Sequence, residues 1–254
     1  MQEQKNNLSI PGAIILAGIL IAGGIYMSNK KDNIVVEKNV TTTEQLAGPI
    51  TEKDHILGNP NAPIVILEYS DTECPYCKIF QKTMDTVIST YGKEGNVAWV
   101  YRHFPVHSRS SKEAEATECA TELGGNTIFW KYISEIYATT TSTNTLDPSL
   151  FPVMAKDVGI DTVKFNQCLE SGKYSATVQT DAENALKSGA QGTPYSIMIL
   201  KEVLDSGLES KINDYIISNN LESNISISGD KKEIVLNGAL PLEIVEKIID
   251  TILK

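Results

Sequence analysis

Two cysteines separated by two residues carry the most specific chemical signal in this 254-residue chain, in the segment Cys74-Pro75-Tyr76-Cys77. At the start of a helix, such a pair can close a small disulfide with little backbone movement. The unpaired N–H groups and the positive dipole end of a helix N-terminus stabilise a thiolate there. We therefore expect Cys74 to be an exposed nucleophile with a pKa below the usual value of about 8.5, and Cys77 to be the shielded resolving thiol.

A CxxC pair can also be half of a zinc site or an inert disulfide. A zinc site needs two further ligands, usually a second CxxC or a pair of histidines. Cys119 and Cys168 are lone cysteines in helical segments, and His55, His103 and His107 form no convincing ligand set with the CxxC. The sequence therefore favours redox chemistry, with no metal and no bound organic cofactor.

The segments around the pair predict a strand, a helix and a second strand. Residues 64–67 are a β-branched apolar run that enters from a turn, and apolar positions between Pro75 and Tyr91 follow helical spacing up to Gly92. Residues 97–101 predict the next strand. This order requires a parallel pair of strands joined by a right-handed crossover. A CxxC in a βαβ unit is typical of thioredoxin-like redox sites.

The rest of the chain predicts a helical block followed by more strands and a last helix. Residues 108–188 are helical in pattern and predict an all-helical insertion. Strands are predicted at 195–200, 225–228 and 233–236, and a helix over 240–253 closes the chain. The polar segment 201–224 predicts one helix around 210–217.

Three segments in combination resemble the DsbA-like thiol:disulfide oxidoreductases: LEYSDTECPYC, RHFPVHS and GTPYSIMIL, with the helical block before the last of them. The resemblance covers about residues 55–254. It implies an α/β, thioredoxin-like fold with an inserted all-helical subdomain, and protein disulfide oxidoreductase activity. Segment 201–224 is longer than a tight hairpin needs, and it could cover a sheet edge or shape the groove for client proteins.

The resemblance also implies the parts of the site around the CPYC segment. Pro194 matches the family's cis-proline opposite the CxxC, and Thr193 would offer backbone atoms to an extended substrate segment. Pro75 and Tyr76 are expected to contact substrate. Tyr76 departs from the strongly oxidising members, which have a histidine at this place, so a very oxidising potential is in doubt.

Two acidic residues precede the pair. Glu68 lies six residues before Cys74, at the end of the first predicted strand, where thioredoxin-like proteins keep a buried acid. Burial would raise the pKa of Glu68, which could then exchange a proton with Cys77; the alternative is a surface carboxylate at a strand end. Glu73, adjacent to Cys74, is expected to face water.

The other two cysteines are expected to form a structural disulfide within the helical insertion. Pairing Cys119 with Cys168 suits an oxidising compartment. The alternative is two buried free thiols that act as small apolar side chains.

Charge and hydropathy divide the chain. With 22 Lys and Arg against 32 Asp and Glu, the net charge of -10 argues against nucleic acid as a partner. Residues 10–27 are almost wholly apolar, and at about 1.5 Å per helical residue they span nearly the ~30 Å of bilayer hydrocarbon. We expect a single N-terminal transmembrane anchor in residues 1–30, a polar linker in 31–51 and the redox domain in 52–254. A cleaved signal peptide and a core helix are the alternatives for the first segment.

Together these expectations describe an enzyme on the outer side of the cell membrane. It would oxidise cysteines of exported client proteins and be reoxidised by a membrane partner of the DsbB or VKOR type, which the resemblance implies. One alternative is a reductase or isomerase of exported disulfides. The other is a non-enzymatic thioredoxin-fold binding module that uses the CxxC as a ligand.

Overall fold

A six-stranded mixed sheet is the centre of the fold in residues 45–254, the part of the chain that the computed structural model describes. Its strand order is β1-β3-β2-β4-β6-β5. The strands are β1 (His55–Gly58), β2 (Ile64–Ser70), β3 (Val97–His103), β4 (Tyr195–Leu200), β5 (Ile225–Ile227) and β6 (Glu233–Asn237). As predicted, β2 and β3 are parallel, and all other neighbours are antiparallel. β1 has no counterpart among the predicted strands.

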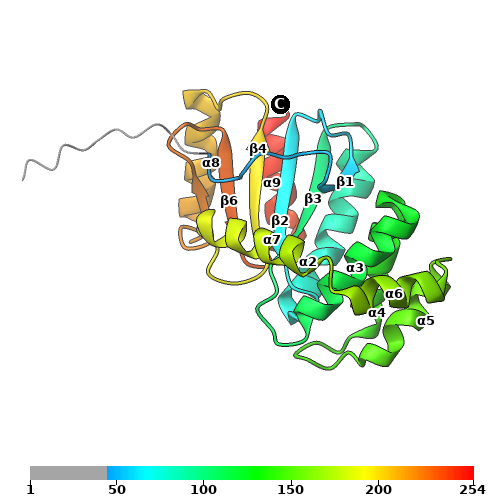
Figure 1. Cartoon of the computed structure of the whole chain (residues 1–254). Helices are drawn as coiled ribbons and strands as arrows, with labels where there is room; N and C mark the ends of the chain where they lie inside the picture. The colour runs from blue at the N-terminus through cyan, green and yellow to red at the C-terminus, as the bar shows by residue number, and fades with distance from the viewer. Residues whose placement is uncertain (1–44) are drawn as a thin grey trace, which may run out of the picture. The chain divides into compact units, whose positions relative to one another are not determined.

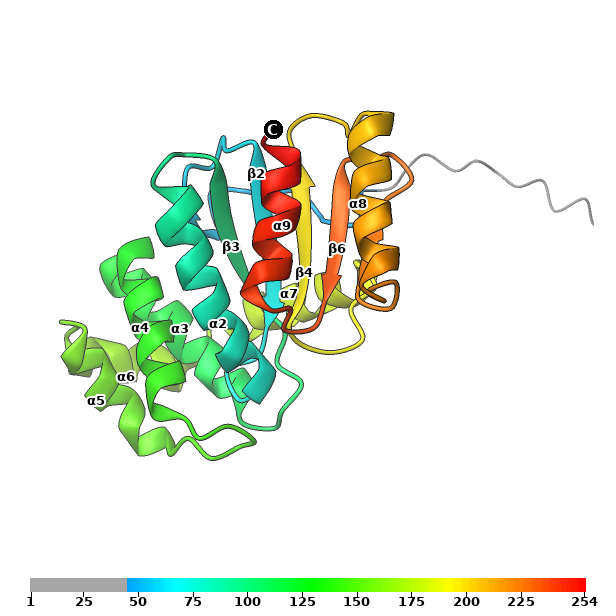
Figure 2. The same cartoon turned by 180° about the vertical axis from the view of Figure 1, so that it is seen from behind.

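The central strand β2 is buried along its whole length, so its alternating side chains fill two separate cores. Ile64 and Ile66 belong to the core beneath α2 (Pro75–Val87) and α9 (Leu242–Ile252). Val65 and Leu67 belong to the core on the opposite face, to which α7 (Ser175–Lys187) contributes Ala185. Helices therefore cover the sheet on both sides, with α7 crossing one face in Figure 1 and α2 and α9 lying over the other in Figure 2.

Four helices and a 3-10 turn form the predicted helical insertion with a core of its own. They are α3 (Ser110–Gly124), α4 (Asn126–Thr139), the turn Pro148–Leu150, α5 (Phe151–Asp157) and α6 (Thr162–Ser171). Tyr132, Phe151 and Phe165 are fully or almost fully buried in this core. The predicted α/β fold with a helical insertion is confirmed, although α7, at the end of the predicted range, packs on the sheet rather than in the insertion's core.

The segment before β1 packs on the domain, which corrects the predicted linker boundary. The backbone N–H groups of Leu46 and Ala47 donate to the carboxylate of Glu233 in β6, at 2.7 and 3.0 Å. The Arg102 guanidinium donates to the Pro49 carbonyl oxygen at 2.8 Å. Residues 45–51 are therefore part of the domain, because burial of Ala47 and these hydrogen bonds fix the backbone.

The remainder of the predicted linker, and the whole of the predicted anchor in residues 1–30, lie outside the described residues. Within residues 45–254, no helix has both the length and the apolar character needed to span a bilayer.

The polar segment after β4 contains α8 (Ser206–Ser218), one turn longer than predicted at its N-terminal end. Ile212 and Ile216 are its buried residues, and they join the core beneath α2 and α9. The helix begins at Asp205, whose side chain accepts hydrogen bonds from the N–H groups of Gly207 and Leu208. The helix therefore covers part of a face of the sheet, whereas the sequence suggested cover for a sheet edge or a role in the client groove.

Cys119 and Cys168 form a disulfide that joins α3 to α6 inside the insertion. The two residues are 49 positions apart. In the chain-entropy model, a cross-link over a loop of this length stabilises the native state by about 4 kcal/mol.

Replacing both residues, as Cys119→Ala/Cys168→Ala, is expected to lower the free energy of unfolding by about 3 to 4 kcal/mol. The measurement is urea unfolding of both proteins with the Cys74–Cys77 pair held oxidised, so that the two samples differ only in the insertion. A decrease of less than about 1 kcal/mol, the size of an ordinary substitution, would contradict a stabilising cross-link.

Candidate active site

The CxxC pair lies where β2 ends and α2 begins. Cys74 is the N-cap residue of α2 and Pro75 occupies the first helical position, where its missing N–H leaves no hydrogen bond unmade. Cys77 is fully buried one turn into the helix, and both thiols are free. Cys74 is only 5% exposed, so the expectation of an exposed nucleophile is wrong. The neighbouring Tyr76 is 63% exposed.

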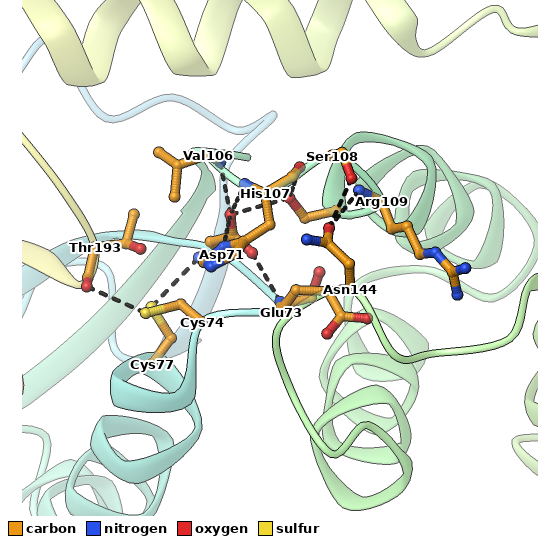
Figure 3. A network of polar contacts seen from close by, with 12 residues as sticks. Asp71, Glu73, Cys74, Cys77, Val106, His107, Ser108, Arg109, Asn144 and Thr193 are labelled. Atoms are coloured by element: carbon orange, nitrogen blue, oxygen red, sulfur yellow. Dashed lines mark hydrogen bonds and ion pairs between the residues drawn. The ribbon is translucent and has the colours of Figure 1, made fainter.

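Strand pairing brings Thr193 and Pro194 to the CxxC. β2 and β4 are antiparallel, and Tyr69 near the end of β2 pairs with Tyr195 at the start of β4. The residues that follow β2 and those that precede β4 therefore meet at one end of the sheet. Cys74 Sγ lies 3.3 Å from the Thr193 carbonyl oxygen (Figure 3), and the Thr193–Pro194 peptide bond is cis.

The pKa values of the two thiols are shifted in opposite directions. A hydrogen bond from the Cys77 thiol lowers the pKa of Cys74 to about 5, against the effect of burial, and the N–H groups of Tyr76 and Cys77 at the start of α2 contribute. Burial raises the pKa of Cys77 well above its usual value, and the neighbouring Cys74 sulfur raises it further. At neutral pH the reduced pair therefore holds one thiolate, on Cys74, and one thiol, on Cys77.

Glu68 is buried on the face of the sheet that α2 covers. Because side chains alternate along β2, Glu68 shares this face with Ile64 and Ile66. Its carboxylate accepts a hydrogen bond from Trp99 Nε1 at 3.0 Å. Burial raises the pKa of Glu68 to about 7, which its hydrogen bonds only partly oppose. The surface alternative is excluded, and the carboxyl group can hold or release a proton near neutral pH.

Asp71 was not singled out from the sequence, yet it organises the turn before Cys74. One carboxylate oxygen accepts the N–H groups of Val106 and His107, at 2.6 and 2.9 Å, and the Ser110 hydroxyl at 3.0 Å. The other oxygen accepts the Glu73 N–H at 2.7 Å. These bonds fasten the turn to the segment before α3 (Figure 3). The only sequence signal for this role of Asp71 is its position as an acidic residue between the end of a strand and a CxxC.

Glu73 is buried, and the expectation that it faces water is wrong. Its carboxylate accepts the Leu146 N–H at 2.8 Å and the Thr140 hydroxyl at 3.0 Å. Burial acts to raise the pKa of Glu73, but these hydrogen bonds, led by that from Leu146, hold it below its usual value. Burial raises the pKa of the adjacent Glu113 to about 8. Glu73 is therefore ionised at neutral pH, whereas Glu113 is mostly protonated.

The loop between α4 and the insertion's 3-10 turn also contacts Glu73. The Thr143 N–H donates to the Glu73 carbonyl oxygen at 2.7 Å. Asn144 Oδ1 accepts the Ser108 hydroxyl and the Arg109 N–H, both at 3.0 Å (Figure 3). Glu73 thus connects the nucleophile's turn to the helical insertion.

The predicted site residues separate into two places. Cys74, Cys77, Thr193, Pro194 and Glu68 gather at the β2–α2 junction, where Pro75 and Tyr76 are exposed at the helix start. Cys119 and Cys168 lie in the insertion's core. The arrangement at the junction provides an acidic thiol, a second thiol that keeps its proton, and a buried acid that titrates near neutral pH. This set is suited to thiol–disulfide exchange.

Comparison with known proteins agrees with this architecture. A family model described as thioredoxin matches residues 50–217. The structure is similar to Wolbachia pipientis alpha-DsbA1, with a TM-score of 0.62, 21% sequence identity, and coverage of 83% of this chain and 96% of that one. It is also similar to oxidised BdbD from Bacillus subtilis, with a TM-score of 0.56, 20% identity, and coverage of 69% and 97%. These similarities establish the fold.

One curated relative is a larger protein. The Na(+)/H(+) antiporter NhaA 1 of Mycolicibacterium gilvum is 32% identical over 148 residues, which is 56% of this chain and 23% of the antiporter. The chain thus spans about a quarter of that relative's length.

The acidity of Cys74 is expected to depend on Cys77. Cys77→Ala removes the hydrogen bond that lowers the pKa of Cys74 most, so this pKa should rise from about 5 by at least about one unit. The measurement is the ultraviolet absorbance of the thiolate as the reduced proteins are titrated; Cys119 and Cys168 are disulfide-bonded and stay silent. A wild-type midpoint near the free-cysteine value of about 8.5 would contradict the assignment.

Glu68→Gln is expected to slow the attack of Cys77 on a mixed disulfide by about 100-fold or more, because the amide cannot take the Cys77 proton. The wild-type rate should rise as the pH increases through about 7, where Glu68 loses its proton, and the variant should lack this rise. Stopped-flow release of a fluorescent peptide from Cys74 measures the step. The matched control is Glu243→Gln, which changes an exposed acid in the first turn of α9. An unchanged pH profile in the Glu68 variant would exclude proton exchange with Glu68.

Proposed function

The chain belongs to the thioredoxin family, and on this premise we propose that it is a protein thiol:disulfide oxidoreductase of the DsbA type that oxidises the cysteines of client proteins. The observation that carries the proposal is that the pKa values of the two thiols are shifted in opposite directions. Cys74, with a pKa of about 5, lies beside the Thr193 carbonyl group, and Cys77 is buried with a raised pKa.

The reaction consists of two exchanges that begin with the Cys74–Cys77 disulfide. A client thiolate attacks Cys74 Sγ, the bond between the two cysteines breaks, and Cys77 leaves. Because Cys77 has a high pKa, its sulfur takes up a proton, for which Glu68 is the nearby buried donor. A second client thiolate then attacks the client sulfur, and Cys74 leaves as a thiolate. The client loses two electrons and gains a disulfide, and the enzyme's pair is reduced.

The low pKa of Cys74 supports oxidation as the favoured direction. A thiolate that is stable at neutral pH is a good leaving group in the second exchange, and its stability favours the reduced enzyme over the oxidised one. Above about pH 5 this stabilisation of the reduced form grows with pH, up to the ordinary thiol pKa of about 8.5. Tyr76, where strongly oxidising relatives have histidine, acts against the most oxidising potentials. A reductase or isomerase, and a binding module that uses the CxxC as a ligand, are the competing functions.

An apolar rim around the pair suits unfolded clients. Tyr76, Ile79 and Val106 are 63%, 56% and 50% exposed. Tyr76 and Ile79 extend from the start of α2, and the Val106 backbone is hydrogen-bonded to Asp71 in the turn before Cys74. Extended segments that expose apolar side chains, as in newly exported chains, could cover this rim while Thr193 hydrogen-bonds to their backbone.

We also propose that the domain works on the extracytoplasmic side of the cell membrane, held there by the apolar segment in residues 1–30. The Cys119–Cys168 disulfide is consistent with an oxidising compartment. A membrane enzyme of the DsbB or VKOR type would then reoxidise the pair. These points rest on the sequence of the N-terminal segment and on compartment chemistry.

The reduction potential of the Cys74–Cys77 pair tests the proposed direction. We expect a value above about −200 mV, nearer to protein disulfide isomerase and DsbA than to thioredoxin at about −270 mV. Equilibration with glutathione, followed by alkylation and mass spectrometry, measures it. A potential near that of thioredoxin would instead favour the reductase.

A trapping variant tests whether the protein exchanges disulfides with clients at all. Cys77→Ala should accumulate mixed disulfides between Cys74 and exported proteins in the cell, visible as reductant-sensitive complexes on gels. Cys74→Ala/Cys77→Ala is the matched control and should trap none. Absence of complexes with Cys77→Ala, together with full activity of Cys74→Ala in cells, would support the binding module.

A further inference from the structure

A second cluster of reactive side chains lies at the β1 edge of the sheet and has no part in the proposed exchange. His55 from β1, His103 from β3 and Glu118 from α3 are all buried. Glu118 Oε1 lies 2.7 Å from His55 Nε2 and 3.1 Å from His103 Nε2. The three potential donor atoms thus lie within 4.8 Å of one another. We call these residues the His-Glu-His cluster.

The cluster has the donor atoms of a transition-metal site. Imidazole nitrogen and carboxylate oxygen are the usual zinc ligands, and three protein ligands with an open fourth position are a common arrangement. In a tetrahedral site with bonds of about 2.1 Å, neighbouring donors are about 3.4 Å apart. The separations of 2.7 and 3.1 Å from Glu118 would therefore need to widen by about 0.7 and 0.3 Å.

The surrounding residues hold two of the ligands in place. The His55 ring stacks on Phe129 with 3.6 Å between centroids and 4° between planes. The His103 backbone N–H donates to Asp181 Oδ2 at 3.1 Å, which fixes the position of this residue on β3. Such preorganisation reduces the movement that metal binding would require.

An opening beside the cluster supplies space for a fourth ligand. A cavity of about 430 Å³ is lined by His55, Tyr101, Glu118 and Asp181, among others. Water can therefore reach the Glu118 carboxylate and the His55 ring from this side. The Asp181 carboxylate at its wall could orient such a water, or approach the ion itself.

We propose that His55, His103 and Glu118 bind a divalent transition-metal ion, with zinc as the best match to two nitrogens and one carboxylate oxygen. A water in the cavity completes the coordination. The ion fastens the edge strand β1 and its neighbour β3 to helix α3, so it links the sheet to the helical insertion. The sequence indicated no metal because the three residues are far apart in the chain and do not involve the CxxC.

Metal binding to the full-length chain tests the site. The protein is first treated with chelator, and the Cys74–Cys77 pair is oxidised so that no free thiolate can bind metal. Titration with Zn²⁺ by calorimetry should give one ion per chain. Titration with Co²⁺ should give the visible absorption bands of a four-coordinate ion without the charge-transfer band of a thiolate ligand. Failure to bind either ion would overturn the proposal and identify the cluster as a hydrogen-bonded network alone.

Variants locate the ion. Glu118→Gln and His55→Gln should each weaken Zn²⁺ binding at least tenfold, and Zn²⁺ should raise the melting temperature of the wild type more than that of either variant. Glu183→Gln, which alters an exposed acid on α7, is the matched control and should bind as the wild type does. Equal affinity in wild type and both cluster variants would place the ion elsewhere and overturn the assignment.

Two points keep the test decisive. If the cluster variants do not fold, the wild-type cobalt spectrum and stoichiometry still decide the question. Titration with Ca²⁺ tests the type of ligand, because Ca²⁺ prefers sites made of oxygen atoms alone. Tighter binding of Ca²⁺ than of Zn²⁺ would contradict a site built on two imidazoles. Since the disulfide pair is oxidised throughout, none of these outcomes depends on the proposed oxidoreductase activity.

Discussion

The register between β2 and β4 determines the geometry of the site. Pairing of Tyr69 with Tyr195 places the turn that leads to Cys74 beside Thr193 and Pro194. The same register puts Glu68 on the α2 side of the sheet, together with Cys77. A slip of one residue would turn every side chain of one strand to the opposite face, which would exchange Glu68 with an apolar neighbour and expose the cores. The complete burial of β2 on both faces prevents such a slip.

The site holds a thiolate although acidic residues surround it. Glu68, Asp71, Glu73 and Glu113 are all buried near the β2–α2 junction. These groups differ in their hydrogen-bond donors: Asp71 accepts three backbone N–H groups and Glu73 one backbone N–H and one hydroxyl, whereas Glu113 has one carboxyl oxygen without a partner among the described residues. Cys74 has its own donors in Cys77 and the first turn of α2.

Local sequence patterns predicted the strands and the helix that hold the cysteine pair. Contacts between residues far apart in the chain explain the predictions that were wrong. The helix after Cys74 and the parallel strands on either side of it follow from periodicity, because their signals lie within a few residues. The partners of Glu73 lie 67 and 73 residues away in the chain, and no local pattern shows that they will bury it. Leu46 and Ala47 were assigned to a linker because the carboxylate that holds them is 187 and 186 residues away. His55 and Glu118 are 63 residues apart, so their meeting was also invisible.

The disulfide in the insertion and the reactive pair are almost equally buried, so exposure does not separate their chemistry. Cys119 and Cys168 are 1% and 7% exposed, and Cys77 and Cys74 are 0% and 5% exposed. The difference lies in the surroundings: the Cys119–Cys168 bond joins two helices in the insertion's core, whereas Cys74 lies at a helix start that supplies donors for a thiolate. In the proposed exchange, one bond would therefore open and close with each client while the other stays closed in the folded insertion.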